Sequence, residues 1–184
     1  MTNIFKGSMA ALVTPFRNGK IDEKALKELI EFHIKNGTTA LVPCGRTGES
    51  PTLTYEEHDR VIELTVQFAK GRIPVIAGTG SNSTEEAIML TKHAEKVGAD
   101  ASLQVSPYYN RPTQKGLYLH FKAIAESVKI PIILYNIASR TGVNIEPETF
   151  VKLASTKNII GVKEASGSLD QMSRIRQLCP KDFL

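Results

Sequence analysis

Lys163 is the residue of this 184-residue chain with the clearest potential for covalent chemistry. It directly follows the apolar run Ile159–Val162, which predicts a buried strand. A lysine at this point is either an ordinary exposed strand end or, inside a closed barrel, a desolvated amine with a lowered pKa. A neutral amine can attack a ketone and form an imine, whose protonated form then acts as an electron sink.

Three other side chains could support imine chemistry, and each also has an ordinary structural explanation. Tyr135 ends the preceding apolar run, so its phenol could shuttle a proton or simply be hydrogen-bonded at the edge of the core. The hydroxyl of Thr47 could relay a proton or cap a turn. Arg140 could bind a substrate carboxylate through two parallel hydrogen bonds, or lie on the surface.

Short apolar runs that alternate with amphipathic segments must position these residues. Strands alternating with helices predict a parallel sheet with right-handed crossovers, either an open doubly wound sheet or a closed (β/α)₈ barrel. In both architectures catalytic groups gather at the carboxyl ends of the strands. We expect six buried strands, at Met9–Val13, Ala40–Cys44, Ile73–Ala77, Ala101–Val105, Ile130–Tyr135 and Ile159–Lys163.

Capping signals predict a helix after each of these strands. The last three residues, 182–184, resemble the first step into a further strand. The expected helix starts are marked by Asp22, Thr54 with Glu57, Ser83 with Glu86, Thr113, Pro147, and Ser168 with Gln171.

The composition indicates a globular protein that binds neither membranes nor nucleic acids. Hydrophobic residues make up 41% and charged residues 23%, and the net charge of +4 is spread along the chain. No apolar run approaches the roughly 18 residues of a membrane span. The N-terminal segment Met1–Lys6 lacks the apolar stretch of a signal peptide, so we expect a cytoplasmic protein.

The sequence predicts neither a metal nor a nucleotide cofactor. Cys44 and Cys179 lie far apart and are expected to be reduced thiols, and the histidines form no paired metal motif. The segment Gly78–Gly80 lacks the third glycine of a dinucleotide fingerprint, and no phosphate-binding GxxxxGK[ST] loop occurs.

Five segments at the expected strand ends carry a resemblance that extends from Phe5 to Leu184. Together they resemble the pyruvate-dependent aldolase family that includes the dihydrodipicolinate synthases and N-acetylneuraminate lyase. The resemblance implies a (β/α)₈ barrel. It also implies condensation of pyruvate with aspartate semialdehyde to hydroxy-tetrahydrodipicolinate, in lysine and diaminopimelate biosynthesis, with a covalent Schiff base and no cofactor. The segments are Cys44–Pro51, Val75–Gly80, Pro107–Pro112, Leu134–Gly142 and Gly161–Gly167.

The resemblance also implies a role for each matching residue. Lys163 is the Schiff-base lysine and Tyr135 the proton-relay tyrosine. Thr47 contacts pyruvate from the GxTGE loop, which also contains Gly48, and Arg140 binds the carboxylate of the semialdehyde. Tyr109 matches a tyrosine that crosses a dimer interface into the neighbouring active site, so the resemblance implies a homo-oligomer, a dimer of dimers.

Many members of this family are inhibited by lysine at the same interface. Tyr55 stands where lysine-sensitive members often have histidine, so feedback inhibition is an expectation that a lysine titration of the activity would test. The matching positions are Ser50, Pro51, Tyr55, His58, Asn82, Glu86 and Tyr108.

Arg46 departs from the family pattern, in which threonine is usual and belongs to the proton relay. Arginine stays protonated and cannot pass a proton as a hydroxyl does. Arg46 could bind a carboxylate and change the substrate, or fill the pocket and weaken the relay. We expect a weakened synthase.

The length is the second departure, because such a barrel needs about 250 residues. The expectation is a single incomplete domain over residues 1–184, with about six βα units and without units seven and eight and the C-terminal helices. Six units would leave two sheet edges open. Two alternative functions therefore stand beside the synthase: an aldolase for another aldehyde, as in the sialic-acid and keto-sugar-acid lyases, and a non-catalytic truncated chain.

Overall fold

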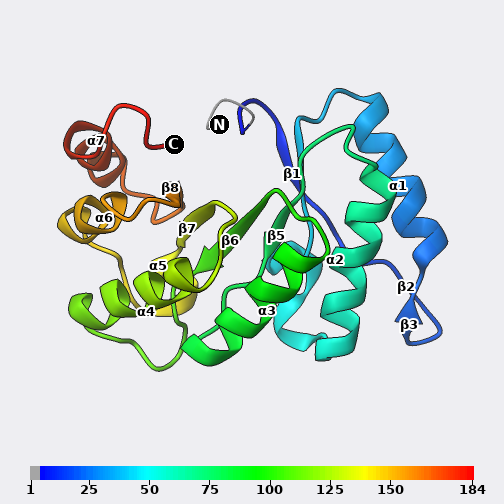
Figure 1. The fold of residues 1–184 in the computed structure, drawn as a ribbon, viewed down its shortest axis with the longest axis horizontal. Coiled ribbons are helices and arrows are strands. Elements are labelled where there is room, and N and C mark those ends of the chain that lie inside the picture. Colours follow the sequence, from blue (N-terminus) through cyan, green and yellow to red (C-terminus); the bar gives the residue numbers. More distant parts are fainter. Residues whose placement is uncertain (1–4) are drawn as a thin grey trace. The chain divides into compact units, whose positions relative to one another are not determined.

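The computed structural model describes residues 5–184, whose elements are labelled in Figure 1. Residues 1–4, part of the segment considered above for a signal peptide, lie outside the described residues. The chain forms two compact units, one built from residues up to Gly78 with His93–Ser102, the other from Thr79–Lys92 with Leu103–Leu184. Within the described range, no helix is long and apolar enough to cross a membrane.

The first unit is built on short parallel strands. Strand β1 (Met9–Ala11) pairs in parallel with β4 (Ala40–Val42), and a single bridge joins Leu41 to Val75, just before β5 (Ile76–Gly78). Helices α1 (Glu23–Lys35) and α2 (Tyr55–Ala69) pack against each other. The core of this unit consists of Leu12, Leu26, Ile30, Leu41, Cys44, Val61, Ile62, Leu64, Ala69, Val75, Ala77, Ala94 and Ala99.

A small hairpin that we did not predict precedes α1. Strands β2 (Phe16–Arg17) and β3 (Lys20–Ile21) pair antiparallel around the two-residue turn Asn18–Gly19. Both turn residues have positive φ, as the tight hairpin turns that follow strand twist require, and Asn-Gly is the dipeptide that adopts them most readily. That dipeptide was the signal in the sequence that could have predicted the hairpin.

The second unit contains the strands whose ends carry the candidate nucleophile. Strand β6 (Ala101–Val105) enters this unit at Leu103 and is followed in the sheet by β7 (Ile132–Asn136) and β8 (Ile159–Glu164), which are parallel to each other. Side chains of β7 and β8 pack against α4 (Gln114–Ser127), α6 (Pro147–Ala154) and α7 (Leu169–Leu178). The buried core is Ala87, Leu117, Phe121, Ile124, Ala125, Val128, Ile132, Leu134, Ile145, Phe150, Leu153, Ile159, Ile175, Cys179 and Phe183.

The expected strands and helix starts are confirmed, with strand bounds that differ by a few residues. Thr54 and Glu57 form a complete capping box, and the side chains of Asp22, Thr113 and Ser168 each accept a hydrogen bond from a backbone N–H of the first turn. The Ser83 hydroxyl does the same at the start of α3 (Thr84–Lys96). These caps satisfy N–H groups that the helix itself leaves unpaired.

The expected step into a further strand is also visible in the second unit. The N–H of Leu184 donates to the Ile160 carbonyl (2.9 Å), and the Leu184 carbonyl accepts from the N–H of Val162 (2.8 Å). This exchange on either side of Gly161 is the bonding pattern of parallel strands. A side chain at Gly161 would lie 2.6 Å from the Cβ of Leu184, so the close pairing requires glycine.

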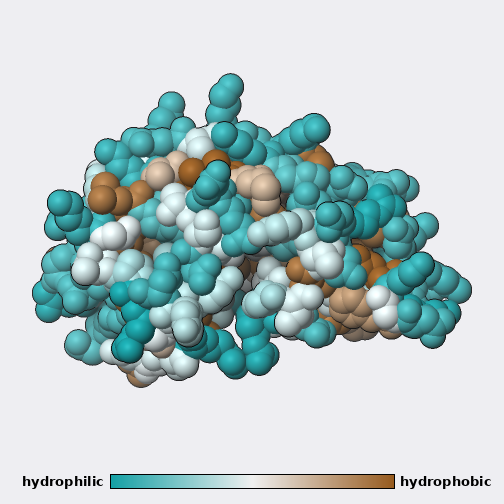
Figure 2. Space-filling view, turned by 90° about the horizontal axis from the view of Figure 1, so that it is seen from below, coloured by the Kyte–Doolittle hydropathy of each residue, from teal (hydrophilic) through white to brown (hydrophobic). Residues whose placement is uncertain are grey.

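On the face drawn in Figure 2, apolar side chains lie among hydrophilic ones in several places and gather in a larger group at the right of the picture. Large apolar side chains that are exposed include Met9, Val13, Phe16, Phe32, Tyr55, Met89, Tyr109, Leu119, Val151, Leu169 and Leu178.

His120 gives the fold a dependence on pH. This histidine of α4 is 6% exposed; its Nδ1 lies 2.8 Å from the Thr84 hydroxyl, and its Nε2 has no partner among the described residues. Burial lowers the pKa of His120 to about 4. The folded chain therefore keeps this imidazole neutral at pH values where the unfolded chain protonates it, near 6.5.

We expect the free energy of unfolding to fall as the pH drops from about 6.5 towards 4, by at most roughly 3 kcal/mol from this residue. Above pH 6.5 its contribution is constant, because both states are then neutral. Urea unfolding of the parent and of His120→Gln at pH 7, 5.5 and 4.5 would measure it. The variant should lose less stability on acidification, and equal losses in both proteins would contradict the assignment.

Candidate active site

The register between β7 and β8 places Tyr135 beside Lys163. The Lys163 Nζ atom lies 4.4 Å from the centroid of the Tyr135 ring. Successive side chains of a strand point to opposite faces, and Leu134 and Val162, one residue earlier in each strand, pack towards the helices. Tyr135 and Lys163 therefore share the face of the sheet that these helices do not cover.

Tyr135 is held firmly in this position. It is buried, and its backbone carbonyl accepts hydrogen bonds from both the N–H (3.0 Å) and the hydroxyl (3.2 Å) of Ser106, which follows β6. A buried tyrosine whose backbone is fixed on both sides presents its ring in one orientation. Tyr135 therefore gives the Lys163 side chain a neighbour in a fixed position.

Lys163 keeps substantial contact with solvent, although the atoms around it remove part of its hydration. This desolvation disfavours the ammonium form and lowers the pKa of Lys163 below the ordinary lysine value. A larger fraction of the side chain is consequently the neutral amine at a given pH. That is the form that attacks a carbonyl carbon.

Arg140 lies five residues after Tyr135, on the short helix α5 (Ala138–Thr141). Its side chain is exposed. The helix ends at Gly142, whose N–H donates to the Ala138 carbonyl and whose φ of +75° favours glycine. The sequence did not predict this short helix. This single turn begins two residues after the end of β7, so the backbone of Arg140 lies just beyond the carboxyl end of that strand.

The loop that carries Tyr109 is bound to the loop that carries Arg140. The N–H of Tyr109 donates to the Thr141 carbonyl (3.4 Å), and Nε of Arg111 donates to the Gly142 carbonyl (2.8 Å). Tyr109 has a φ of +73°, which is uncommon for an aromatic residue, and is 91% exposed. The surrounding bonds thus hold its backbone in an unfavourable conformation while its ring is presented to solvent.

Thr47, Arg46 and Gly48 belong to the first unit, in the one-turn helix η2 (Arg46–Gly48) after β4. Gly48 is buried, its carbonyl accepts a bond from the Thr14 hydroxyl (2.7 Å), and a Cβ there would lie 3.0 Å from the Leu12 carbonyl oxygen. Arg46 and Thr47 are exposed, and neither side chain has a hydrogen bond or ion pair with the described residues.

The positions expected to bind lysine are also divided between the units. In the second, Asn82 Nδ2 donates to the Tyr108 carbonyl (3.1 Å), and Glu86 accepts a bond from the Ser81 hydroxyl. In the first, Ser50 and Pro51 lie in the helical turn η3 (Ser50–Thr52), and Tyr55 is exposed at the start of α2. His58 is buried, with its Nε2 2.9 Å from the Gly78 carbonyl, and burial lowers its pKa.

Polar side chains that the sequence analysis missed lie behind the candidate site. Asn136 and Glu164 directly follow Tyr135 and Lys163, and Asn136 Nδ2 donates to Glu164 Oε2 (2.9 Å). Strand alternation directs both side chains towards the helix-covered face, where polar groups are unusual. The sequence did contain a signal for this pair: Asn136 and Glu164 are polar residues at strand positions where alternation predicts apolar side chains.

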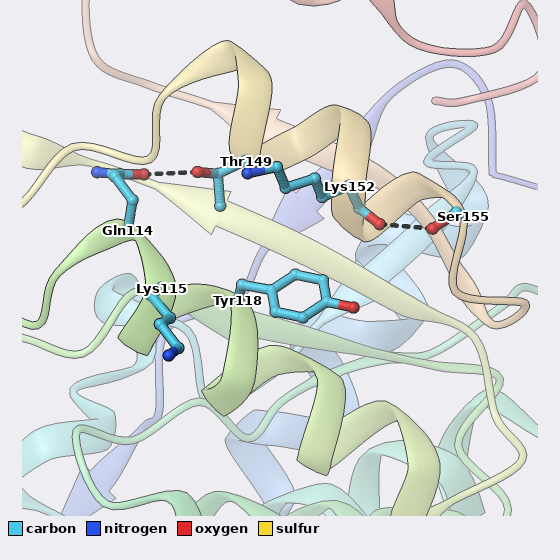
Figure 3. A pocket seen from close by; sticks show the side chains of 6 residues that line it. All are labelled: Gln114, Lys115, Tyr118, Thr149, Lys152 and Ser155. Atoms are coloured by element: carbon cyan, nitrogen blue, oxygen red, sulfur yellow. Dashed lines mark hydrogen bonds between the residues drawn. The ribbon is translucent and has the colours of Figure 1, made fainter.

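A groove lies elsewhere in the second unit and contains none of the predicted site residues. It has a volume of about 530 Å³ and is shown in Figure 3, where the Thr149 hydroxyl donates to Gln114 Oε1. The groove is lined by helix side chains rather than by strand ends, so we do not assign the chemistry to it. Its lining residues are Gln114, Lys115, Tyr118, Thr149, Lys152 and Ser155.

Within residues 5–184, no group of three or more histidine, cysteine, aspartate or glutamate side chains is arranged to hold a metal ion. Both cysteines are free and buried, and burial raises the pKa of each thiol. Because the thiolate is the reactive form, neither cysteine is a good nucleophile. Lys163 is therefore the better candidate for covalent chemistry.

Comparison with known proteins identifies the family of the chain. The model of the dihydrodipicolinate synthetase family matches residues 4–184. The chain belongs to this family. It is 66% identical over 180 residues to 4-hydroxy-tetrahydrodipicolinate synthase of Syntrophus aciditrophicus (strain SB), an alignment that covers 98% of this chain and 62% of the relative.

Solved structures of the dihydrodipicolinate synthetase family match the fold. Dihydrodipicolinate synthase from Aquifex aeolicus is 55% identical with a TM-score of 0.95, over 97% of this chain and 61% of that one. The chloride-inhibited enzyme from Acinetobacter baumannii, complexed with pyruvate, is 52% identical with a TM-score of 0.91, over 93% and 59%. The predicted α/β fold of the (β/α)₈ family is thus confirmed over about three fifths of the length of these structures. The chain likewise spans only 62% of the length of the Syntrophus relative.

Proposed function

We propose that the chain takes part in condensing pyruvate with aspartate semialdehyde to 4-hydroxy-tetrahydrodipicolinate, with Lys163 as the Schiff-base nucleophile. The observation that carries the proposal is the position of Lys163 Nζ, 4.4 Å from the centre of the Tyr135 ring, together with its lowered pKa. Membership of the family and the pyruvate complex of the Acinetobacter relative support the same substrate. Lysine and diaminopimelate biosynthesis is the corresponding pathway, and the cytoplasm the proposed location.

The chemistry begins with attack of the neutral Lys163 amine on the ketone carbon of pyruvate. Loss of water forms a protonated imine, which withdraws electrons from the adjacent methyl group. A methyl proton then leaves, and the resulting enamine carbon forms a bond to the aldehyde carbon of the second substrate, whose oxygen takes up a proton. The amino group of that substrate then attacks the imine carbon and displaces Lys163, so that the cyclic product is released and the lysine amine is regenerated. Tyr135 is paired with Lys163 across the two strands. Its phenol therefore carries protons to and from the reacting groups.

The remaining site residues bind substrate or complete the relay. The exposed guanidinium of Arg140 binds the carboxylate of the semialdehyde, and Thr47 contacts pyruvate beside the buried Gly48. Tyr109 completes the relay from a second copy of the chain, so the active assembly is a homo-oligomer, a dimer of dimers. Lysine binding at Ser50, Pro51, Tyr55, His58, Asn82, Glu86 and Tyr108 stays a prediction from the family resemblance.

The proposed nucleophile can be identified by trapping. Incubation with pyruvate followed by borohydride should leave a reduced adduct on Lys163, mapped by mass spectrometry. The trapping rate should rise with pH and reach its plateau below the pH expected for an ordinary lysine, because the pKa of Lys163 is lowered. Lys163→Ala should abolish the adduct.

Lys157→Ala is the matched control, because Lys157 is an exposed lysine shortly before the same strand. This variant should trap pyruvate as the parent does. A folded parent that forms no adduct, or one that forms it on another lysine, would exclude the proposal and favour a non-catalytic chain.

A further prediction concerns Arg46, which stands where the family usually has a threonine of the proton relay. Arg46→Thr should raise the condensation rate, by roughly tenfold, because a hydroxyl can pass a proton and a guanidinium cannot. Arg46→Ala removes the same bulk without supplying a hydroxyl, so its rate should rise less. Initial rates with both substrates would measure this. A rate of Arg46→Thr at or below that of the parent would show that the arginine does not impair the relay.

Another prediction concerns active sites to which two copies of the chain contribute. Tyr109→Phe and Lys163→Ala should each lose condensation activity, whereas a mixture of the two inactive chains should recover part of it, since mixed dimers contain one intact site. Tyr109 is 91% exposed, so its variant should keep the parent's thermal stability. Sedimentation velocity would establish the assembly. Recovery of no activity from chains shown to associate would mean that Tyr109 does not act across an interface.

A further inference from the structure

Asn136 and Glu164 form a second contact between β7 and β8, one residue beyond Tyr135 and Lys163. The Nδ2 of Asn136 donates to Oε2 of Glu164 over 2.9 Å, on the face covered by helices. Asn136 is fully buried. The two strands are thus joined by a side-chain hydrogen bond directly behind the pair that carries the proposed chemistry.

Asn136 also closes the loop that contains Arg140. Its Nδ2 donates to Oδ1 of Asn144 (2.8 Å), and its Oδ1 accepts a bond from the N–H of Ile145 (3.1 Å). Asn136 thus directly precedes the loop of residues 137–143, and its side chain binds the two residues that follow the loop. Both amide hydrogens and the amide oxygen of Asn136 are used, so the side chain has a single favourable orientation.

Glu164 is fixed by further partners on the same face. Its Oε2 also accepts a bond from Nε2 of Gln171 (3.1 Å), and its Oε1 accepts one from the N–H of Ser166 (2.7 Å). Gln171 in turn exchanges two bonds with the amide of Asn144, of 2.8 and 3.1 Å. Asn136, Glu164, Gln171 and Asn144 therefore form a closed ring of side-chain hydrogen bonds.

The ring is connected to α4 by Gln114. The Nε2 of Gln114 donates to the Asn144 carbonyl (2.8 Å), and its Oε1 accepts bonds from the Thr149 hydroxyl and the Glu146 N–H. The bond between Gln114 and Thr149 is drawn in Figure 3. Together with Gln171 on α7, these contacts attach the ring to three helices, α4, α6 and α7. A ring anchored in this way cannot shift without breaking several bonds together.

We infer that Asn136 and Glu164 are positioning residues, whose hydrogen-bonded ring holds Lys163, Tyr135 and Arg140 in one arrangement. The inference rests on the proposed function, since it concerns the same site. Neither residue reaches the face that carries Lys163, so both act through their neighbours in the chain. Breaking a buried ring of polar groups leaves donors or acceptors unpaired. The two strands and the loop that contains Arg140 are then no longer held together by the same side chains.

Asn136→Asp tests the ring, because it keeps the size of the side chain while replacing a donor by a carboxylate that faces Glu164. The rate of pyruvate trapping at saturating pyruvate should fall roughly tenfold or more, as small misplacements of reacting groups cost that much. The apparent pKa of Lys163 should rise, because a displaced amine regains hydration. Competitive acetylation with acetic anhydride across a pH series, read at Lys163 by mass spectrometry, measures that pKa without pyruvate.

Two further proteins separate positioning from general destabilisation. Asn136→Asp combined with Glu164→Gln exchanges donor and acceptor and restores the parent's net charge, so the trapping rate should return to within about threefold of the parent. The control is Asn158→Asp, since Asn158 Nδ2 donates to the carbonyls of Ala125, Val128 and Ile130 just before β8. This control should melt at a lower temperature while keeping the parent's trapping rate and Lys163 pKa.

An unchanged rate and pKa in Asn136→Asp would overturn the inference, as would an equal loss in Asn158→Asp or no recovery in the exchanged pair. If Asn136→Asp does not unfold cooperatively, Glu164→Gln decides in its place. It keeps one acceptor oxygen and should lose less activity, and a parental rate would again overturn the inference. A parent that traps no pyruvate would exclude the proposed function, whereas the acetylation series would still test the ring.

Discussion

The pairing of β7 with β8 is the constraint on which the candidate site depends. In a parallel pair with fixed register, a residue and its partner must point to the same face, and the next residue of each strand must point to the other. Here this rule puts Tyr135 with Lys163 on one face and Asn136 with Glu164 on the opposite face. A slip of β8 by one residue would break both pairs, and would turn the lysine towards the helices.

The helix-covered face makes such a slip costly. Ile132 and Leu134 are fully buried there, and the carboxamide of Asn136 is buried with all its hydrogen-bonding groups in use. A shifted register would expose the leucine and leave the amide and the carboxylate unpaired, each at a cost of about 1–3 kcal/mol. Apolar packing and polar pairing therefore select the same register, and agreement between the two fixes the site more firmly than either would alone.

Much of this arrangement could be predicted from the sequence, because local signals carry it. The strand ends and the capping residues follow from periodicity and from side chains that bond within one helical turn, as Thr54 and Glu57 show. The pairing of Asn136 with Glu164 could not be predicted in that way, since the residues are far apart in sequence and their contact depends on strand register. The sequence left Lys163 open between an exposed strand end and a desolvated amine. In the structure its side chain is exposed, and desolvation nevertheless lowers its pKa.

The distribution of the proposed roles over the chain has a chemical consequence. Lys163, Tyr135 and Arg140 all belong to the second unit, whereas Thr47 and Arg46 belong to the first. Formation of the imine needs an amine of lowered pKa and a fixed neighbour, both of which β7 and β8 supply. In the proposed function, the arginine at position 46 concerns the relay, whereas the reactivity of the lysine depends on the two strands that hold it.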